Sequence, residues 1–252
     1  MTRQRWTGFA FIALLLAAWQ LAVATRLIDT PSVPSVSEIV AAWYRVIASG
    51  DMPKELWPSL YRIAVGYGLA IVIAVPLGLV MGASRFMYFL LEPLTELLRP
   101  IPSSAYIPIA ILFLGIGDAM KEFVVFFSCL FPILINTYSG VLAIDPVLID
   151  TGRTFGLRRG EILRRIVFRA AVPHILTGMR ISLAIALIVV VVAEMVAGSS
   201  GIGYFILDQQ RTFRVPEMFA GIFTLGVLGY AANAVFLLVE SRILRWRPRA
   251  VL

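Results

Sequence analysis

Long apolar runs restrict the fold of this chain more than any other feature. Each run has about the 20 residues that a helix needs to cross the hydrocarbon core of a bilayer. With 60% hydrophobic residues and a mean hydropathy of +0.88, the chain has too few polar side chains to cover a soluble domain. The sequence therefore predicts an all-α, polytopic membrane protein in a lipid bilayer. The runs lie near Leu60–Ala83, Met87–Gly115, Phe123–Ala143, Ile175–Gly198 and Phe219–Leu244.

A further apolar stretch, Gly8–Ala24, follows Arg3 and Arg5. It resembles a secretory signal, and Ala22–Ala24 offers a small-residue cleavage pattern. We favour the alternative, an uncleaved first span, which brings the expected total to about six transmembrane helices. The polar segment Ile28–Trp57 comes next.

Within that polar segment, the spacing of apolar residues predicts one amphipathic helix near Ser37–Ile47. Ser35 or Ser37 is the expected cap, because a serine hydroxyl can accept a backbone N–H at a helix start.

Basic residues divide unevenly between the two sides of the predicted membrane. An excess of basic residues marks the cytoplasmic side. We therefore expect both termini and the loop Asp145–Pro173 in the cytoplasm, whether or not the first stretch is cleaved. The cytoplasmic segments carry thirteen basic residues: Arg3, Arg5, Arg85, Arg153, Arg158, Arg159, Arg164, Arg165, Arg169, Arg242, Arg245, Arg247 and Arg249. The outer segments carry six: Arg26, Arg45, Lys54, Lys121, Arg211 and Arg214.

The second long run is broken in its middle. Prolines and charged residues interrupt what would otherwise be one helix, and backbone groups freed by proline cannot face lipid. We expect Arg99–Pro108 to face the protein interior, where Ser103 and Ser104 could bond freed carbonyls. A proline kink without function is the alternative. The interrupting residues are Glu92, Pro93, Glu96, Arg99, Pro100, Pro102 and Pro108.

Two features lie between the last two spans. Gly198–Gly203 is rich in glycine and serine and predicts a flexible external turn. Tyr204–Gln209 after it predicts a short helix against the outer surface.

The loop Asp145–Pro173 is the one long polar interruption between spans. Asp145 and Pro146 form a helix start, and Gly156 suits a helix end that needs positive φ. A second short helix is expected over Arg159–Phe168. Two basic helices meeting at a glycine suggest a docking element. A positively charged loop that only sets topology explains the same spacing.

Ionisable residues inside spans usually face the protein interior or a polar path. Arg62 and Arg180 lie near span ends, where we expect them to extend to the lipid headgroups. Arg99 lies deeper, beside the proline break, and is our best candidate for a pathway or gate. A structural pair with Glu92 or Glu96 is the alternative for Arg99. Two amides, Asn136 and Asn233, are expected to bond between helices.

Several chemistries find no support in the sequence. A P-loop needs a lysine directly after a glycine, and neither Lys54 nor Lys121 has that neighbour. We expect no catalytic residues and no metal site, because Cys129 stands alone in an apolar run and His174 is the one histidine. The net charge of +7 is explained by the excess of basic residues in the predicted cytoplasmic segments, and it does not indicate nucleic-acid binding.

The central loop resembles the EAA loop of ATP-binding cassette (ABC) importer permeases. That loop carries Glu-Ala-Ala, Gly, Ile and Leu-Pro at similar spacing. Asp150 stands for the Glu, Thr151 and Gly152 for the alanines, and Gly156 for the Gly, followed by Ile166 and Val172–Pro173. Gly152 should loosen a helix by about 1 kcal/mol relative to alanine.

Other stretches extend this resemblance over nearly all of residues 30–245. They are PSVPSVSEIV, LEPLTELLRPIPSSAYIPIAILFLGIGDAMK, LFPILINT and VVAEMVAGSSGIGYFILD. Together they are similar to permeases of the nitrate, sulfonate, taurine and bicarbonate importer group.

This resemblance implies a type I ABC importer permease fold with a cytoplasmic coupling helix, in a bacterial inner membrane. It implies two permease copies, which we expect to be identical, and a cytoplasmic ABC ATPase dimer that holds ATP and Mg. It also implies a periplasmic or extracellular substrate-binding protein. The permease would be no enzyme and carry no cofactor. Residues 1–57 would form the first transmembrane helix and an external segment, and residues 58–252 the core with the coupling loop 145–173.

The resemblance also assigns roles to residues. Glu194 matches the Ala-Glu position of the family, which suggests an external gate or a contact for the binding protein. Coupling to the ATPase is expected from Leu148, Asp150, Thr151, Gly152, Arg153, Phe155, Gly156 and Pro173. The translocation path or gate is expected from Arg99, Ser103, Ser104, Glu194, Arg62 and Asn136.

Other functions fit the sequence less well. The same architecture could import a thiamine-type pyrimidine precursor instead of a small anion. An ATP-independent secondary transporter should show a repeat with broken helices in both halves, and only Arg99–Pro108 is broken. A membrane-embedded enzyme should carry clustered catalytic carboxylates or histidines, which the predicted spans lack.

Overall fold

The computed structural model describes residues 2–27, 30 and 32–246. Ile28, Arg247 and Arg249, named above, lie outside the described residues, as do the first proline of the PSVPSVSEIV stretch and the side chains of Arg3 and Arg5. Over the described part, all regular structure is helical. The predicted all-α class is therefore confirmed.

Among the described residues, four helical stretches are long and apolar enough to cross a membrane: α3 (Asp51–Ala83), α6 (Asp118–Leu142), Arg159–Ala197 and α11 (Val215–Ile243). A further pair of apolar helical segments, α4 (Arg85–Leu98) and Ser103–Leu114, meets at 91° and makes a fifth crossing if the two form one broken span.

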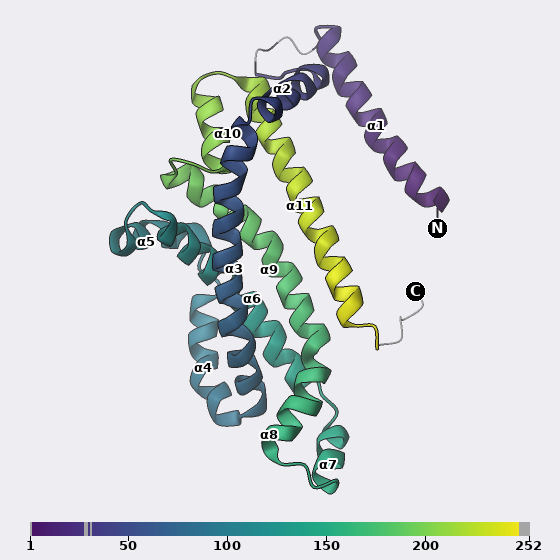
Figure 1. Cartoon of the computed structure of the whole chain (residues 1–252), viewed down its shortest axis with the longest axis vertical. Coiled ribbons are helices and arrows are strands. Elements are labelled where there is room, and N and C mark those ends of the chain that lie inside the picture. Colours follow the sequence, from purple (N-terminus) through teal and green to yellow (C-terminus); the bar gives the residue numbers. More distant parts are fainter. Residues whose placement is uncertain (1, 28–29, 31, 247–252) are drawn as a thin grey trace.

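The first helix, α1 (Thr2–Ala24), stands apart from the bundle (Figure 1). Its apolar part, Ala10–Ala24, is shorter than a full span. The structure thus supports four or five crossings, and the predicted total of about six is not confirmed.

The core of the bundle is α6, which packs against α3 on one side and α9 (Phe168–Ala197) on the other. Small residues recur every fourth position along α3, and such a stripe lets two membrane helices approach closely. At Gly78, an added Cβ would lie 2.7 Å from Thr137 Cβ of α6. Cys129 is buried here, as a small core residue, and its thiol donates to the carbonyl of Ser182 at 3.4 Å.

The two ends of the bundle carry different elements (Figure 1). One end holds α2 (Val36–Ala48) and α10 (Ile202–Arg211), which both contact α11. Ser35 caps α2 as predicted, with Glu38 completing a capping box. The backbone N–H and hydroxyl of Ser35 hold the pKa of Glu38 below its usual value. The other end holds α7 (Pro146–Thr154) and α8 (Arg159–Ile162).

The break at Arg99–Pro108 differs from its prediction. Most of this segment is exposed in the chain, and Ile107 is its one buried residue. The two arms diverge at a right angle, so the corner has neighbours on one side only. Tyr106, rather than Ser103 or Ser104, satisfies a freed carbonyl, since its hydroxyl donates to the Leu98 carbonyl at 3.3 Å. A short 3₁₀ turn, Ser103–Tyr106, leads from the break into α5 (Ile107–Leu114).

The second short helix of the loop is not separate. It continues through a π turn, Leu163–Val167, into α9, so that Arg159–Ala197 is one stretch. The Phe168 N–H donates to the carbonyl of Leu163, five residues earlier. Pro173, predicted as the end of the loop, therefore lies inside a helix.

Candidate functional site

The helix α7 begins as its sequence predicts. The Asp145 carboxylate accepts the N–H of Val147 at 2.9 Å, and Pro146 occupies the first helical position. A carboxylate at this point satisfies an N–H group that a helix start leaves without a partner.

The end of α7 is equally well defined. Gly156 has a φ of +73°, a left-handed conformation that glycine adopts without strain. Its N–H donates to the Arg153 carbonyl at 2.9 Å, and the Leu157 N–H donates to the Gly152 carbonyl at 3.0 Å. These two bonds form a Schellman motif, which turns the chain toward α8. The prediction that Gly156 ends this helix is confirmed.

Gly152 has a packing role that the sequence did not reveal. It is buried, and an added Cβ would lie 2.6 Å from Cδ1 of Ile166 in the π turn. The missing side chain lets α7 rest against the base of the long α8–α9 stretch. This contact fixes α7 in the loop even though glycine lowers helix propensity.

One exposed side of α7, together with its C-cap residue Phe155, carries three large apolar side chains. Val147, Leu148 and Phe155 are 66%, 50% and 80% exposed. Apolar side chains gathered at the polar end of a membrane protein mark a contact surface for another chain. Asp150 and Arg153 pair with each other at 2.9 Å, but both are exposed, so this pair contributes little stability.

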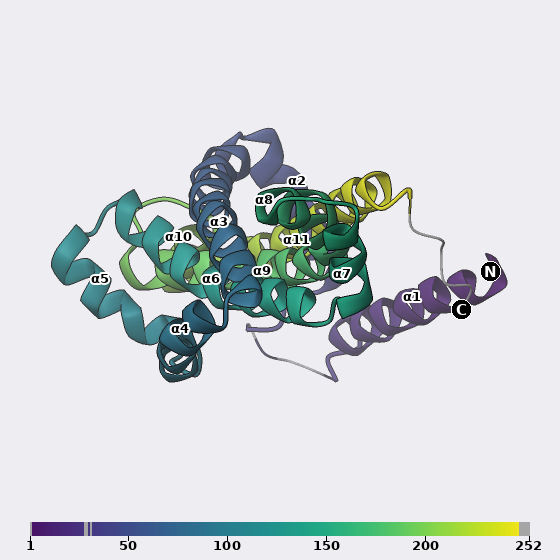
Figure 2. The ribbon, with the colours of Figure 1, turned by 90° about the horizontal axis from the view of Figure 1, so that it is seen from below.

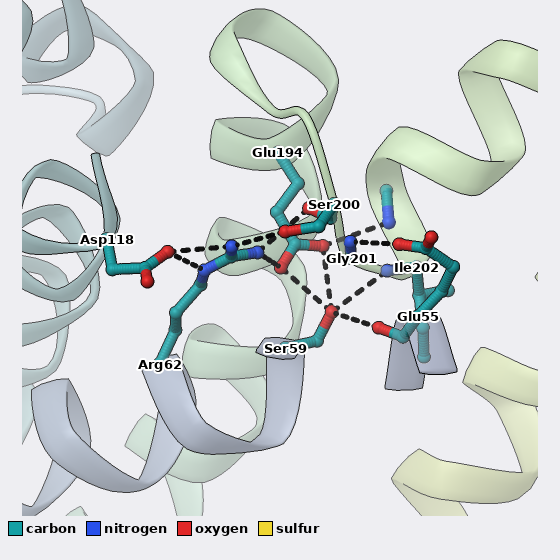
Figure 3. A network of polar contacts seen from close by, with 9 residues as sticks. Glu55, Ser59, Arg62, Asp118, Glu194, Ser200, Gly201 and Ile202 are labelled. Carbon is teal, nitrogen blue, oxygen red and sulfur yellow. Dashed lines mark hydrogen bonds and ion pairs between the residues drawn. The ribbon is translucent and has the colours of Figure 1, made fainter. Parts of the chain in front are cut away.

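The opposite end of the molecule holds a buried ionic network that joins α3, α6 and α9 (Figure 3). At its centre lies the carboxylate of Glu194, whose side chain has no exposed surface. Arg62 reaches Glu194 at 2.6 Å and Asp118 at 2.7 Å. The hydroxyl of Ser59 donates to Glu194 at 2.8 Å. A buried charge is tolerated only when it is paired and hydrogen-bonded in this way.

The same network holds the turn between α9 and α10. The Gly201 N–H donates to Glu55 at 2.6 Å, and the Gly203 N–H donates to Glu194 at 3.0 Å (Figure 3). Arg62 donates to the carbonyl of Ser200 at 2.9 Å. At Gly201, where φ is +111°, an added Cβ would overlap the Glu194 carboxylate. The predicted flexible turn is therefore wrong, because buried charges bind its backbone.

Two further expectations for this end fail. Arg62 does not extend to the lipid headgroups: it is 2% exposed, since three elements supply it with acceptors. Glu194 is 1% exposed, so it is not a surface residue for a binding protein to touch. A gate role for either residue stays a prediction.

Sequence reasoning missed three members of this network, Glu55, Ser59 and Asp118. A signal was present, because Glu55, Ser59 and Arg62 follow at intervals of four and three residues and share one face of α3. A polar stripe on an otherwise apolar span predicts buried partners. Lys121, predicted for the outer segments, is buried in the first turn of α6, with 2% of its surface exposed.

A cavity of about 530 Å³ lies beside the break, between the 103–106 turn, α6 and α9. It brings together Arg99, Ser103 and Asn136, three residues predicted for the pathway. Ser104 does not line it, and Glu194 and Arg62 belong to the network above. The remaining walls are mainly apolar or aromatic, with Tyr106, Phe127, Phe131, Ile135, Ile181 and Ile185 among them.

Arg99 and Asn136 of this cavity are already engaged within the chain. Arg99 pairs with Glu96 at 2.9 Å, the alternative that the sequence left open. Both side chains are about half exposed, so the guanidinium still faces open space. The Asn136 amide donates to the Pro132 carbonyl of its own helix at 2.8 Å, not between helices as expected. Among the described residues, no group of His, Cys, Asp or Glu side chains is arranged to hold a metal ion.

Comparison with known proteins identifies this arrangement. Residues 74–245 match the family described as the binding-protein-dependent transport system inner membrane component. The chain belongs to this family. The permease is 31% identical to SsuC of Bacillus subtilis, a putative aliphatic sulfonates transport permease protein, over 95% of this chain and 87% of the relative. It is 32% identical to NrtB of Synechocystis sp., a nitrate import permease protein, over 92% of this chain and 86% of the relative.

The fold agrees with this assignment. The permease matches a structure of the inward-facing MetNI methionine ABC transporter with a TM-score of 0.66 and 18% sequence identity, over 74% of this chain and 93% of that chain. The protein is therefore the transmembrane permease subunit of an ABC importer, an inner-membrane component whose family works with a binding protein and an ATPase. The predicted importer-permease fold is confirmed.

Proposed function

We propose that this permease carries a small anionic solute of the sulfonate or nitrate class. The named activities of the two relatives, SsuC and NrtB, support this class. The cavity at the break supports it as well, since the half-exposed Arg99 supplies the positive charge that an anion requires. The solute arrives on an external binding protein, and a separate ATPase dimer that binds ATP and Mg supplies the energy.

The coupling surface is the apolar face of α7. Its exposed Phe155 and Leu148 lie at the end of the bundle that is remote from the ionic network (Figure 1). We place this end and both chain termini in the cytoplasm, because the basic residues gather there. This part of the proposal rests on the exposed apolar side chains of Val147, Leu148 and Phe155. They lie on a helix whose start is capped by Asp145 and whose end is set by Gly156.

A second copy of the chain completes the pathway. The helix α5 projects from the bundle on the side away from α1 (Figure 2). Leu112 and Phe113 on it are 80% and 79% exposed, and the chain leaves it through an irregular turn at Gly115. Irregular backbone at membrane depth must be covered by protein or face a wet cavity. A homodimer with α5 and the break at its interface meets this requirement.

Purification of the tagged permease from native membranes in mild detergent, followed by mass spectrometry, tests the assembly. We expect a cytoplasmic ATPase in equal copy number to the permease, and ATP-dependent uptake of sulfonates or nitrate in proteoliposomes with the binding protein. Transport without ATP by a pure homo-oligomer would contradict the importer assignment. Uptake of a thiamine-type pyrimidine, with no response to anions, would overturn the proposed substrate class.

Replacement of Phe155 by alanine tests the docking surface. We expect about tenfold less ATPase bound to the purified permease, because a large, well-packed aromatic side chain contributes about 1–2 kcal/mol at an interface. Quantitative mass spectrometry of the complex measures the number of ATPase copies bound per permease. Phe213→Ala is the matched control, since Phe213 is 88% exposed at the opposite end. Equal loss in both variants, or loss in neither, would remove α7 from the docking surface.

Replacement of Arg99 by glutamine tests the pathway. The change removes the charge and shortens the side chain but leaves it polar, so we expect anion uptake per assembled complex to fall about tenfold, the effect of roughly 1.4 kcal/mol. Arg85→Gln is the control, because Arg85 is exposed and does not line the cavity. Unchanged uptake in Arg99→Gln at subsaturating solute would place the path elsewhere.

A further inference from the structure

An apolar groove separates α9 from α11 along one side of the bundle. Its volume is about 590 Å³. One wall carries Leu183, Leu187 and Val191 of α9, and the other carries Leu225, Gly226 and Gly229 of α11. The two polar residues of the groove, Arg180 and Asn233, lie together at its end.

The glycines of α11 hollow out this groove. An added Cβ at Gly226 would meet no atom within 4 Å, and one at Gly229 would meet only Leu187, at 3.8 Å. The glycines at the α3–α6 contact behave differently, since a Cβ at Gly66 would lie 2.6 Å from a backbone oxygen. Gly226 and Gly229 thus leave space that a helix neighbour does not fill.

Contacts of α11 with α2 and with α9 lie at the two ends of the groove. Near its outer end, α11 is tied to α2, because Trp43 donates to Thr224 at 3.0 Å and stacks edge-on against Phe223. At the other end, the Arg180 guanidinium donates through Nε to the Asn233 amide oxygen at 3.1 Å, which bridges α9 and α11. Contacts within the chain therefore fix the position of α11 at both ends of the groove.

The charge at the end of the groove has no counterion in the chain. Among the described residues, no carboxylate lies within ion-pair distance of Arg180. Arg180 is exposed, and its only hydrogen bond in the described part uses Nε, so its two terminal nitrogens have no protein partner there. A cation at a lipid-exposed position is stabilised by a phosphate, and a guanidinium binds phosphate through two parallel hydrogen bonds.

The length of the groove matches one lipid chain. From Arg180 to Val192 the helix rises about 18 Å, at 1.5 Å per residue. One leaflet of the hydrocarbon core is about 15 Å thick. A phosphate held by Arg180 would therefore place its acyl chain along Leu183, Leu187 and Val191 without crossing the bilayer.

We propose that this groove binds one anionic phospholipid, with the phosphate on Arg180 and an acyl chain over Gly226 and Gly229. The lipid belongs to the leaflet on the α7 side, toward which Arg180 lies. Small hydrophilic anions suit the groove poorly, because its walls are apolar beyond Arg180 and Asn233. The bound acyl chain would fill the space that Gly226 and Gly229 leave between α11 and α9.

The test uses the full-length permease purified with its ATPase and stripped of lipid by detergent washing. Native mass spectrometry follows its titration with palmitoyl-oleoyl phosphatidylglycerol or with the zwitterionic phosphatidylcholine. We expect one tightly bound phosphatidylglycerol per permease and at least about fivefold weaker binding of phosphatidylcholine, since only the first carries net negative charge. Arg180→Gln should remove this preference, and Gly229→Leu should weaken both lipids about tenfold by filling the groove.

Two controls keep the result specific. Gly68→Leu adds the same side chain at a glycine of α3 whose Cβ also meets nothing within 4 Å, and it should bind lipid as the wild type does. Arg85→Gln removes a basic residue elsewhere and should keep the preference. If Gly229→Leu fails to assemble, Gly226→Leu takes its place.

Three outcomes would overturn the proposal. Lipid binding by the groove-filling variant equal to that of the wild type would place the lipid elsewhere. Equal affinity for the two lipids would remove the role of Arg180. A photo-crosslinker placed at Gly226 in native membranes should yield a lipid adduct, and a permease–permease adduct instead would show that a second copy covers the groove.

Discussion

Replacement of Glu194 by glutamine is expected to destabilise the permease by about 3 kcal/mol, because the buried Arg62 loses its fully buried partner and keeps only Asp118, whose side chain is 57% exposed. The variant keeps the shape of the Glu194 side chain but removes its negative charge. Arg62, the partner of that charge, is only 2% exposed. The turn at Gly201–Gly203 should loosen with it, since the same carboxylate accepts the Gly203 N–H. We expect thermal unfolding in detergent to occur about 10 °C lower.

A matched control separates burial from charge at this position. Glu217 pairs with Arg45 at 3.2 Å at the same end of the molecule, but the Arg45 side chain is 65% exposed. Glu217→Gln should therefore change stability by less than about 1 kcal/mol. Equal effects of the two substitutions would mean that the network contributes no special stability.

A double substitution tests the pairing itself. In Arg62→Met with Glu194→Leu, no charge of this pair remains unmatched, and apolar replacement of a buried pair is often close to neutral. We expect the double variant to be more stable than Glu194→Gln. A double variant as unstable as the sum of its single changes would show that the two residues act independently.

Replacement of Gly156 by valine is expected to reduce ATP-dependent transport about a hundredfold while leaving the fold intact. A β-branched residue at a φ of +73° carries strain of about 3 kcal/mol, so the loop would occupy the conformation seen here about a hundredfold less often. Phe155, the neighbour of Gly156, would leave its position at the end of α7. Transport in proteoliposomes and thermal unfolding together measure this effect.

Gly160 supplies the matched control for this change. It belongs to the same loop, an added Cβ there meets nothing within 4 Å, and its φ is not in the left-handed region. Gly160→Val should therefore retain most transport. Normal transport by Gly156→Val with the ATPase present would show that the Schellman turn is not needed for coupling. Loss of folded protein would show a structural role instead.

Local physics explains why much of the fold was predictable. The apolar runs locate the spans because a bilayer core demands about 20 apolar residues, and this demand is met within one segment. The ends of α7 were predicted from Asp145 and Gly156, because a cap and a left-handed turn depend on neighbours a few residues away. The assignment to importer permeases also lay in the sequence, in motifs spread over most of the chain.

Predictions failed where contacts join distant segments. Arg62 was expected at the lipid headgroups, yet it pairs with Glu194, 132 residues further along the chain. Glycine at position 152 was expected only to loosen a helix, yet its missing side chain admits Ile166. The break at Arg99–Pro108 was expected inside the protein, but the angle of 91° between its arms leaves it exposed in one chain.

The sequence by itself therefore determined the class of the protein, the course of its helices and the limits of the α7 loop. Each of these depends on hydropathy or on hydrogen bonds between near neighbours. Only the tertiary structure decided which buried charges meet, which turn they hold and where α9 and α11 stay apart. A buried ion must find a partner of opposite charge, and the choice among several is made by helix packing, which brings together residues with no local relation in the chain.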